Sequence, residues 1–285
     1  MTGYSAAPAR RSGMEWATRA LFGLLLAGVA VAALFYDPAW FAGWVLLACL
    51  LAAREWHRMV YAGQGAVMRP IHTQALITAL AIALALVLLL NHLAPVGLAV
   101  LAAGTLASFA LAMRDGGKGL WHAGGVLYLG LPAMALVGLR AFAPQGLLIV
   151  LGLFLIVWAT DTGALLSGRM IGGPKLAPRL SPGKTWAGAI GGSICAAVIY
   201  GLYLGLLGFA MLPGMALALG LSIIAHGGDL AESAIKRHFG RKDSGSMIPG
   251  HGGVLDRIDS TLACSIVLAI LVFGAHLNPL FGGHP

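Results

Sequence analysis

Half of the acidic residues of this chain lie in one short stretch, residues 229–259. The 285-residue sequence contains ten Asp and Glu and eighteen Lys and Arg, and it is 59% hydrophobic. The stretch holds five acidic and five basic side chains: Asp229, Glu232, Asp243, Asp256 and Asp259, with Lys236, Arg237, Arg241, Lys242 and Arg257. The sequence on both sides is apolar. Because so apolar a chain concentrates its charge here, we expect its chemistry here.

The spacing of these residues predicts two carboxylate clusters separated by a loop. A helix over 229–239 would place four polar residues on one face, at i, i+3, i+4 and i+7: Asp229, Glu232, Ser233 and Lys236. Glycines and Pro249 then interrupt the helix and allow the backbone to approach a ligand closely. Asp256 and Asp259 follow about one turn apart, where the next apolar run begins.

Two carboxylate clusters that flank a glycine-rich basic loop suit the binding of a divalent cation among phosphates. Mg²⁺ takes oxygen ligands and is usually shared between one or two carboxylates and substrate phosphates. Lys and Arg side chains would bind the remaining phosphate charge. The alternative is a solvated loop whose salt bridges have little consequence. Asp256 and Asp259 argue against it, because ionised groups beside an apolar run are costly and usually functional.

A second group of candidate residues surrounds the segment 169–184. Asp161 precedes it, near the end of an expected helix, where a cap or a hydrogen bond to a neighbouring Thr is the alternative role. Lys175 lies in the segment, and Ser181-Pro-Gly-Lys-Thr185 ends it at a helix start, where exposed N–H groups favour anions. Pro178 occupies the place of the first P-loop glycine, so a phosphate contact of another kind fits better. Contact with lipid headgroups is the alternative.

Composition predicts an all-α, polytopic integral membrane protein, because only 10% of the residues are charged and the mean hydropathy is +0.87. About nine transmembrane helices are expected, near 20–36, 38–53, 73–90, 94–113, 123–142, 146–165, 186–208, 211–226 and 260–275. The predicted parts are a cytoplasmic tail over 1–18, N-terminal transmembrane helices over 19–150, and a catalytic transmembrane region over 151–285 with cytoplasmic loops 169–184 and 227–259. The three cysteines lie in apolar runs and show no metal-ligand spacing or disulfide framework.

The distribution of positive charge predicts the orientation in a cell (inner) membrane. With nine helices, seventeen of the eighteen Lys and Arg fall on one side, and Arg140 is alone on the other. Positive charge marks the cytoplasmic side, which places the N-terminus and both polar loops there and the C-terminus opposite. This orientation also explains the net charge of +8. No nucleic-acid partner is expected, because the charges do not cluster with aromatic residues.

The run from residue 233 to 259 resembles the signature of the CDP-diacylglycerol synthase (phosphatidate cytidylyltransferase) family over 27 consecutive positions. It reads Ser233-x-Ile-Lys-Arg-x₄-Lys-Asp-x-Gly-x₂-Ile-Pro-x-His-Gly-Gly-Val-x-Asp-Arg-Ile-Asp259. The loop 175–186 and the segment around Asp161 are also similar to that family. Ala187 stands where many members carry Glu, and the first 150 residues resemble the family in hydropathy more than in motif.

The resemblance implies that CTP and phosphatidic acid react to give CDP-diacylglycerol and pyrophosphate, with Mg²⁺ required, in contact with membrane lipids. A second cation such as K⁺ is left open, and a homodimer is what the family suggests. The metal carboxylates it implies are Asp229 and Asp256, with Asp259 and Asp161. The candidate catalytic residues are Asp229, Asp256, Lys236, Arg237, Lys242 and His251. The candidate substrate-binding residues are Lys175, Ser181, Lys184, Thr185, Ser233, Asp243 and Arg257.

Two other classes of protein fit the pattern less well. A CDP-alcohol phosphotransferase would carry Asp-Gly-x₂-Ala-Arg, which is absent here, and a final pair of aspartates four residues apart; Asp256 and Asp259 are three apart. A transporter would use intramembrane carboxylates as a cation pathway. In this sequence the ionisable residues gather at one face instead of at mid-depth, which favours the enzyme.

Overall fold

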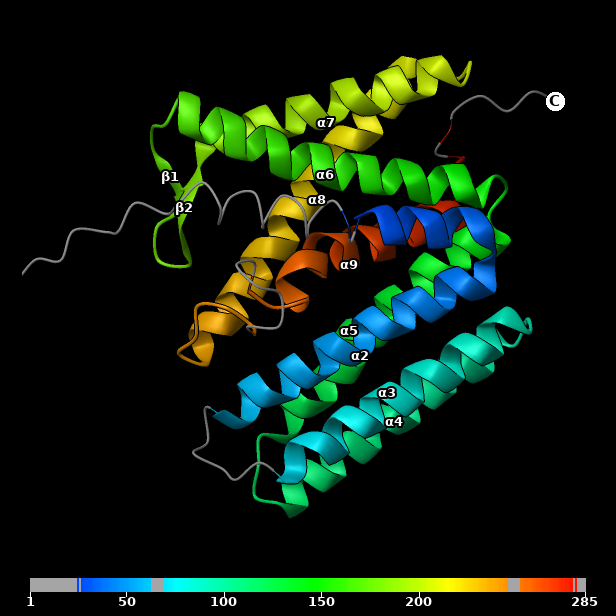
Figure 1. Ribbon diagram of the computed structural model, residues 1–285, viewed down its shortest axis with the longest axis vertical. Coiled ribbons are helices and arrows are strands. Elements are labelled where there is room, and N and C mark those ends of the chain that lie inside the picture. The colour runs from blue at the N-terminus through cyan, green and yellow to red at the C-terminus, as the bar shows by residue number, and fades with distance from the viewer. Residues whose placement is uncertain (1–24, 26, 63–68, 246–251, 279, 281–285) are drawn as a thin grey trace, which may run out of the picture.

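The chain folds into a bundle of long helices (Figure 1). The computed structural model describes residues 25, 27–62, 69–245, 252–278 and 280. In this part of the chain the elements are α2 (Pro38–Ala62), α3 (Arg69–Leu90), α4 (Ala94–Arg114), α5 (Gly119–Phe142), α6 (Gly146–Met170), β1 (Lys175–Ala177), β2 (Ser181–Thr185), α7 (Trp186–Leu206), α8 (Met211–His238), α9 (Leu255–Ala269) and the π-helical turn η1 (Ile270–Gly274).

Eight helices of the described part are long and apolar enough to cross a membrane, and Ala27–Tyr36 forms a shorter apolar helix. The prediction of a polytopic all-α membrane protein is therefore confirmed. The first predicted span begins at residue 20, which lies outside the described residues. Large apolar side chains such as Leu80, Leu106 and Leu206 are exposed on the outside of the bundle, as expected of surfaces that face lipid.

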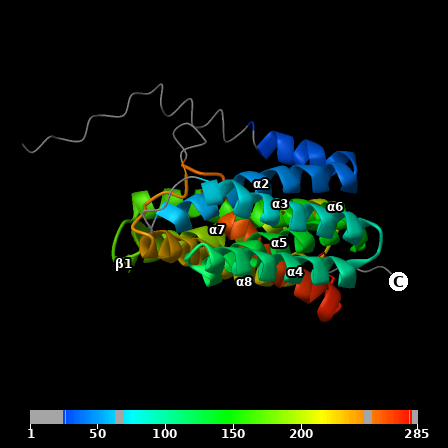
Figure 2. The same cartoon turned by 90° about the horizontal axis from the view of Figure 1, so that it is seen from below.

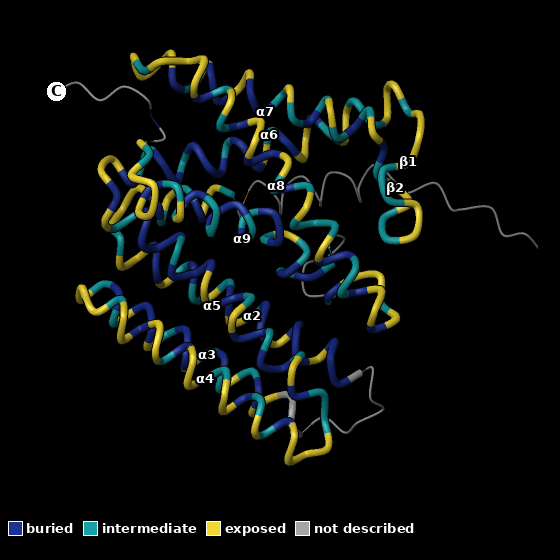
Figure 3. The backbone as a smooth tube through the Cα atoms, turned by 180° about the vertical axis from the view of Figure 1, so that it is seen from behind, coloured by how far each residue is buried: buried dark blue, intermediate teal, exposed yellow. Residues whose placement is uncertain are grey.

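Helix α5 lies inside the bundle and α4 at its edge. In the most apolar window of α5 61% of the residues are buried, against 22% in α4. Figure 3 shows the same contrast, with exposed residues gathered on α3, α4, α7 and the hairpin. The views in Figures 1 and 2 place the hairpin and the C-terminal end of α8 at one end of the bundle and the α3–α4 turn at the other. The polar elements of the chain therefore share one end.

The segment after α6 forms a two-stranded antiparallel hairpin, which the all-α prediction did not include. Strand β1 pairs with β2 in the register Lys175↔Thr185 and Ala177↔Ser181. Helix α6 cannot continue into this segment, because Gly172 and Gly173 have φ of 70° and 92° and Pro174 follows. The predicted loop 169–184 is thus partly helix and largely hairpin.

Two helices continue well beyond the apolar runs that predict them. Helix α2 was expected to end near residue 53 and ends at Ala62. Helix α8 joins the span expected over 211–226 to the helix considered over 229–239, and it ends at His238. The predicted loop 227–259 is therefore shortened to 239–254, of which 246–251 lie outside the described residues. Hydropathy marks where a helix leaves the apolar layer, but its hydrogen bonds continue until glycine or proline intervenes.

Candidate active site

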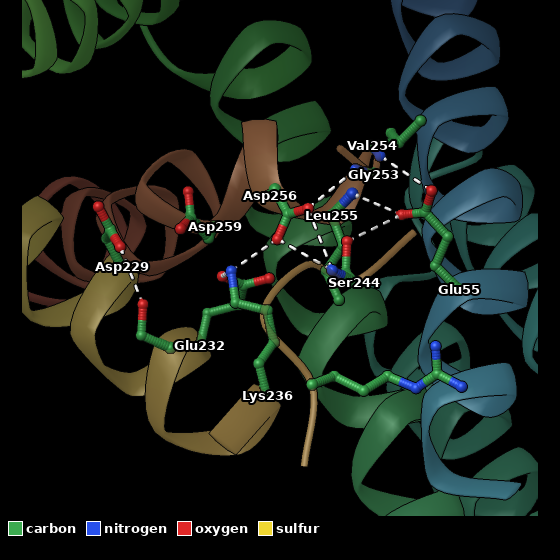
Figure 4. Close-up of polar contacts among 12 residues, drawn as sticks. Glu55, Asp229, Glu232, Lys236, Ser244, Gly253, Val254, Leu255, Asp256 and Asp259 are labelled. Atoms are coloured by element: carbon green, nitrogen blue, oxygen red, sulfur yellow. Dashed lines mark hydrogen bonds and ion pairs between the residues drawn. The ribbon is translucent and has the colours of Figure 1, made fainter. Parts of the chain in front are cut away.

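The ammonium group of Lys236 lies between two carboxylates at the junction of α8 and α9. Its Nζ is 2.5 Å from Glu232 Oε2 and 2.6 Å from Asp256 Oδ1. Glu232 and Lys236 are both buried, and they are four residues apart on α8, as the predicted helical face requires. Figure 4 shows Asp256 reaching toward this pair from α9. The structure thus brings together three of the acidic and basic residues singled out in the sequence.

Asp256 receives further hydrogen bonds from the loop that precedes α9. Its Oδ2 accepts from the backbone N–H of Gly253 at 2.8 Å and from that of Ser244 at 3.1 Å. Both oxygens of Asp256 therefore have partners within the protein. A charge-assisted set of this kind fixes a carboxylate firmly in place.

A second ion pair joins the hairpin to α8. Lys184 Nζ contacts Asp229 Oδ2, and the Ser233 hydroxyl donates to Asp229 Oδ1 at 3.4 Å. The side chains of Lys184 and Asp229 are 22% and 30% exposed, so this pair is more open than the Lys236 cluster. Asp161 and Asp259 interact electrostatically with Asp229, from α6 and α9 respectively. Three of the predicted metal carboxylates, Asp161, Asp229 and Asp259, thus lie within electrostatic range of one another.

The four predicted metal carboxylates, Asp161, Asp229, Asp256 and Asp259, do not form a preassembled protein-only site. Among the described residues no three His, Cys, Asp or Glu side chains lie close enough together to hold a metal ion. Asp256 is occupied by Lys236 and backbone N–H groups, and Asp259 Oδ1 accepts from Ser260 N at 2.7 Å. Asp161 and Asp229 are the more accessible members of the set.

Arg237 and Thr185 have structural bonds in addition to their predicted contacts with substrate. Arg237 donates from Nε to the Leu180 carbonyl at 3.2 Å and from a terminal nitrogen to the Arg241 carbonyl at 3.3 Å, which ties the hairpin to the 239–245 loop. The buried Thr185 caps α7 by accepting from Gly188 N at 3.0 Å. Its hydroxyl is therefore used in holding the start of the helix.

A polar pocket of about 350 Å³ lies beside these clusters. Its lining combines the end of α2 with the loop after α8: Arg58, Arg241, Lys242, Asp243, Ser244 and Gly245. Lys242 and Asp243 were predicted for the site, and the three basic side chains make the pocket suitable for an anion. Of the other predicted residues, Lys175 and Ser181 lie on the hairpin and Arg257 is exposed on α9. His251 lies outside the described residues.

Sequence reasoning missed Glu55, Arg58 and Ser244. Glu55 and Arg58 belong to a polar segment that was expected to be a connection and is the last part of α2. A usable signal was present in the sequence, since Glu55 is one of only ten acidic residues and lies two positions after the apolar run that ends at Ala53. An ionised group beside an apolar run is costly in free energy and is usually functional. The same argument singled out Asp256. For Ser244 the sequence offers no such signal.

The fold and the site define a polytopic α-helical membrane protein whose acidic and basic side chains converge at one end. Comparison with known proteins narrows this class. A sequence model of the Cytidylyltransferase family matches residues 17–274, and the chain belongs to that family.

Curated relatives are similar to the chain over part of its length. A phosphatidate cytidylyltransferase of Brucella suis biovar 1 is 52% identical over 163 residues, which are 56% of this chain and 58% of the relative. A phosphatidate cytidylyltransferase of Staphylococcus aureus (strain COL) is 46% identical over 151 residues, which are 52% of this chain and 56% of the relative. The chain therefore spans somewhat more than half the length of the curated relatives it matches.

Proposed function

We propose that the protein is a phosphatidate cytidylyltransferase, which transfers the CMP group of CTP to phosphatidic acid and releases pyrophosphate. The observation that carries the proposal is the gathering of acidic and basic side chains around Lys236 and Lys184, at one end of a membrane bundle. An enzyme that joins a soluble nucleotide to a lipid phosphate needs its charged site at such an edge. Membership of the family and the names of the two relatives support the same reaction.

The reaction needs no protein nucleophile. A phosphate oxygen of phosphatidic acid attacks the α-phosphorus of CTP, one P–O bond forms, and the bond to the β-phosphate breaks as pyrophosphate leaves. The protein's part is to position two anionic substrates and to stabilise the charge that develops. The basic side chains of the pocket, Arg58, Arg241 and Lys242, suit phosphate oxygens. Lys184 is suited to the same role, because its side chain and that of its partner Asp229 are partly exposed, at 22% and 30%.

The residues also fit a divalent cation such as Mg²⁺. The carboxylates of Asp161, Asp229 and Asp259 are hard oxygen donors whose mutual repulsion a cation would relieve. Asp229 and Asp161 are the first candidates to hold it, because they are the more accessible. When bound, such an ion would neutralise phosphate charge and polarise the phosphoryl oxygens. Mg²⁺ does not require three protein carboxylates, because it commonly takes its remaining ligands from substrate phosphates and water.

The site is proposed to face the cytoplasm, where CTP and Mg²⁺ are found. The hairpin and the C-terminal ends of α2 and α8, which carry the basic residues, share one end of the bundle (Figure 1). Positive charge at that end favours the cytoplasmic side. Homodimerisation remains a proposal taken from the family resemblance.

Release of pyrophosphate by the detergent-purified protein tests the proposal. Mg²⁺, CTP and phosphatidic acid are supplied together and then omitted one at a time. We expect activity only with all three, and we expect EDTA to abolish it and added Mg²⁺ to restore it. A folded protein that is inactive with several lipid chain lengths would contradict the proposal and return attention to ion transport, which flux assays in liposomes would examine.

A further inference from the structure

The carboxylate of Glu55 lies buried where the end of α2 meets the start of α9. Its side chain belongs to a residue that is only 4% exposed. Oε1 accepts from Val254 N at 3.1 Å, and Oε2 accepts from Leu255 N at 3.0 Å and from the Ser244 hydroxyl at 3.3 Å (Figure 4). An ionised carboxylate in apolar surroundings is costly unless it is well hydrogen-bonded. All three bonds go to residues in the loop before α9 or at the start of α9, namely Ser244, Val254 and Leu255.

Glu55 supplies a cap that α9 lacks locally. The first N–H groups of a helix have no partner within it, and the N-cap residue Val254 makes no side-chain capping bond. The negative charge of Glu55 is also favourable at the positive end of the helix dipole. The start of α9 therefore depends on a residue 200 positions earlier in the chain. Leu255, whose N–H is bound by Glu55, is followed directly by Asp256 of the candidate site.

The same segment is packed tightly against Glu55. Ser244 links the two carboxylates, because its hydroxyl donates to Glu55 and its N–H donates to Asp256 Oδ2 at 3.1 Å. Gly245 and Gly253 approach so closely that a Cβ on either would overlap the Glu55 carboxylate. Glu55 does not line the 350 Å³ pocket. Its contacts are thus with the segment that carries Asp256 and not with the space open to a ligand.

We infer that Glu55 is a positioning residue of the active site. It clamps Ser244 and the first turn of α9 and so holds Asp256 against Lys236. The inference rests on the proposed function for its kinetic consequences. It joins α2, in the N-terminal half of the chain, to the catalytic end. A buried acid that served only the stability of the bundle would change the amount of folded protein and leave the turnover of each folded molecule intact.

The first test compares Glu55→Gln, Glu55→Asp and the control Gln74→Leu. Gln keeps the shape of Glu but turns an NH₂ donor toward an N–H group, and Asp is one methylene too short to reach all three donors. We expect kcat per folded molecule to fall about tenfold or more in both. The KM values for CTP and phosphatidic acid should stay within about twofold, because the substitution leaves in place the basic side chains that line the pocket, Arg58, Arg241 and Lys242. Gln74 is buried and exchanges two hydrogen bonds with Ser108 away from the site, so its variant should lose stability and keep kcat.

The second test needs no activity. Amide hydrogen exchange of the full-length protein in detergent should be faster over 252–258 in Glu55→Gln than in the wild type, and unchanged there in Gln74→Leu. A double-mutant cycle measures the energetic coupling between Glu55 and Gly245. Gly245→Ala should lower the unfolding midpoint of the wild type, because the new Cβ would overlap the Glu55 carboxylate. The same substitution should lower the midpoint of Glu55→Ala much less, because that side chain no longer fills the space.

These outcomes separate the inference from the proposed function. Wild-type kcat in Glu55→Gln, with unchanged exchange, would overturn the inference and leave the proposed reaction standing. A loss of activity that only follows the loss of folded protein, as in Gln74→Leu, would also overturn it. If the wild type releases no pyrophosphate but Glu55→Gln still shows faster amide exchange, the proposed reaction is contradicted. The role of Glu55 in holding the start of α9 is then still supported. Should Glu55→Ala fail to fold, Glu55→Gln still decides the matter.

Discussion

The site contains two lysine–aspartate ion pairs, Lys236–Asp256 and Lys184–Asp229, which have the same chemistry but different surroundings. Lys236 and Asp256 are 11% and 7% exposed, and Lys184 and Asp229 are 22% and 30% exposed. Lys236 has a second carboxylate, Glu232, at 2.5 Å, and Asp256 has the N–H groups of Ser244 and Gly253. The Lys184 pair instead connects a hairpin to α8 and is supported by one long hydrogen bond, from Ser233.

The difference in burial and hydrogen bonding indicates that the Lys236–Asp256 pair is fixed in place and that the Lys184–Asp229 pair can exchange its partners. Removing one partner from a buried, hydrogen-bonded pair leaves an uncompensated charge, whereas a more exposed pair contributes little to stability. We therefore expect the Lys236 cluster to hold α8 against α9. The Lys184 pair is the place where incoming phosphate could compete for the lysine and a cation for the aspartate.

The largest effect is expected from Asp256→Asn. The variant loses the charge opposite Lys236 and turns an NH₂ group toward backbone donors, so turnover should fall by about a hundredfold to a thousandfold. Pyrophosphate release measures the loss, and elution as a single species in detergent shows that the protein still folds. Retention of most of the CTP-dependent activity would remove Asp256 from the catalytic residues.

Lys236→Met should have the largest effect on stability. It leaves Glu232 and Asp256 buried without their cation, which costs about 3–5 kcal/mol of the free energy of unfolding. Lys184→Met is the matched control and should cost less than about 1 kcal/mol, because that pair is more exposed. Denaturant unfolding of both variants in the same detergent gives the comparison. Equal losses in the two variants would show that the two pairs do not differ as described.

Lys184→Ala should change kinetics more than stability. Loss of a charge-assisted contact to phosphate, about 1.5–3 kcal/mol, would raise the KM for CTP or for phosphatidic acid by about tenfold or more. Initial rates with each substrate varied in turn measure the effect. Unchanged kinetics for both substrates would exclude Lys184 from the site.

The smallest effect is expected from Arg58→Ala. Arg58 lines the pocket from α2, so its loss should raise the KM for an anionic substrate by a few-fold, roughly 1 kcal/mol, and the effect should shrink as salt is added. Arg54→Ala is the matched control, an exposed arginine on the same helix that does not line the pocket. A difference between the two variants that does not depend on salt would argue against a charge contact.

The sequence predicted the features that depend on neighbours along the chain. Long apolar runs predict membrane helices because each run must cover the same apolar thickness. The i, i+4 spacing of Glu232 and Lys236 predicts that they share one helical face, and in the structure they form an ion pair there at 2.5 Å. The hairpin and the true end of α2 were not predicted, because hydropathy reports the edge of the apolar layer and not the end of the hydrogen-bond ladder. The end of α8 at His238 agrees with the helical spacing over 229–239.

By itself the sequence determined an all-α membrane protein with its charge gathered at residues 229–259, because composition and spacing are properties of the chain alone. Only the tertiary structure decided which charges meet. The pairing of Lys184 with Asp229 and the bonds of Glu55 to Val254 and Leu255 join helices far apart in sequence. No local pattern encodes such contacts, since they depend on how the helices pack. For the same reason Asp256 has hydrogen-bond partners within the protein that the family resemblance, which implied a metal ligand, did not reveal.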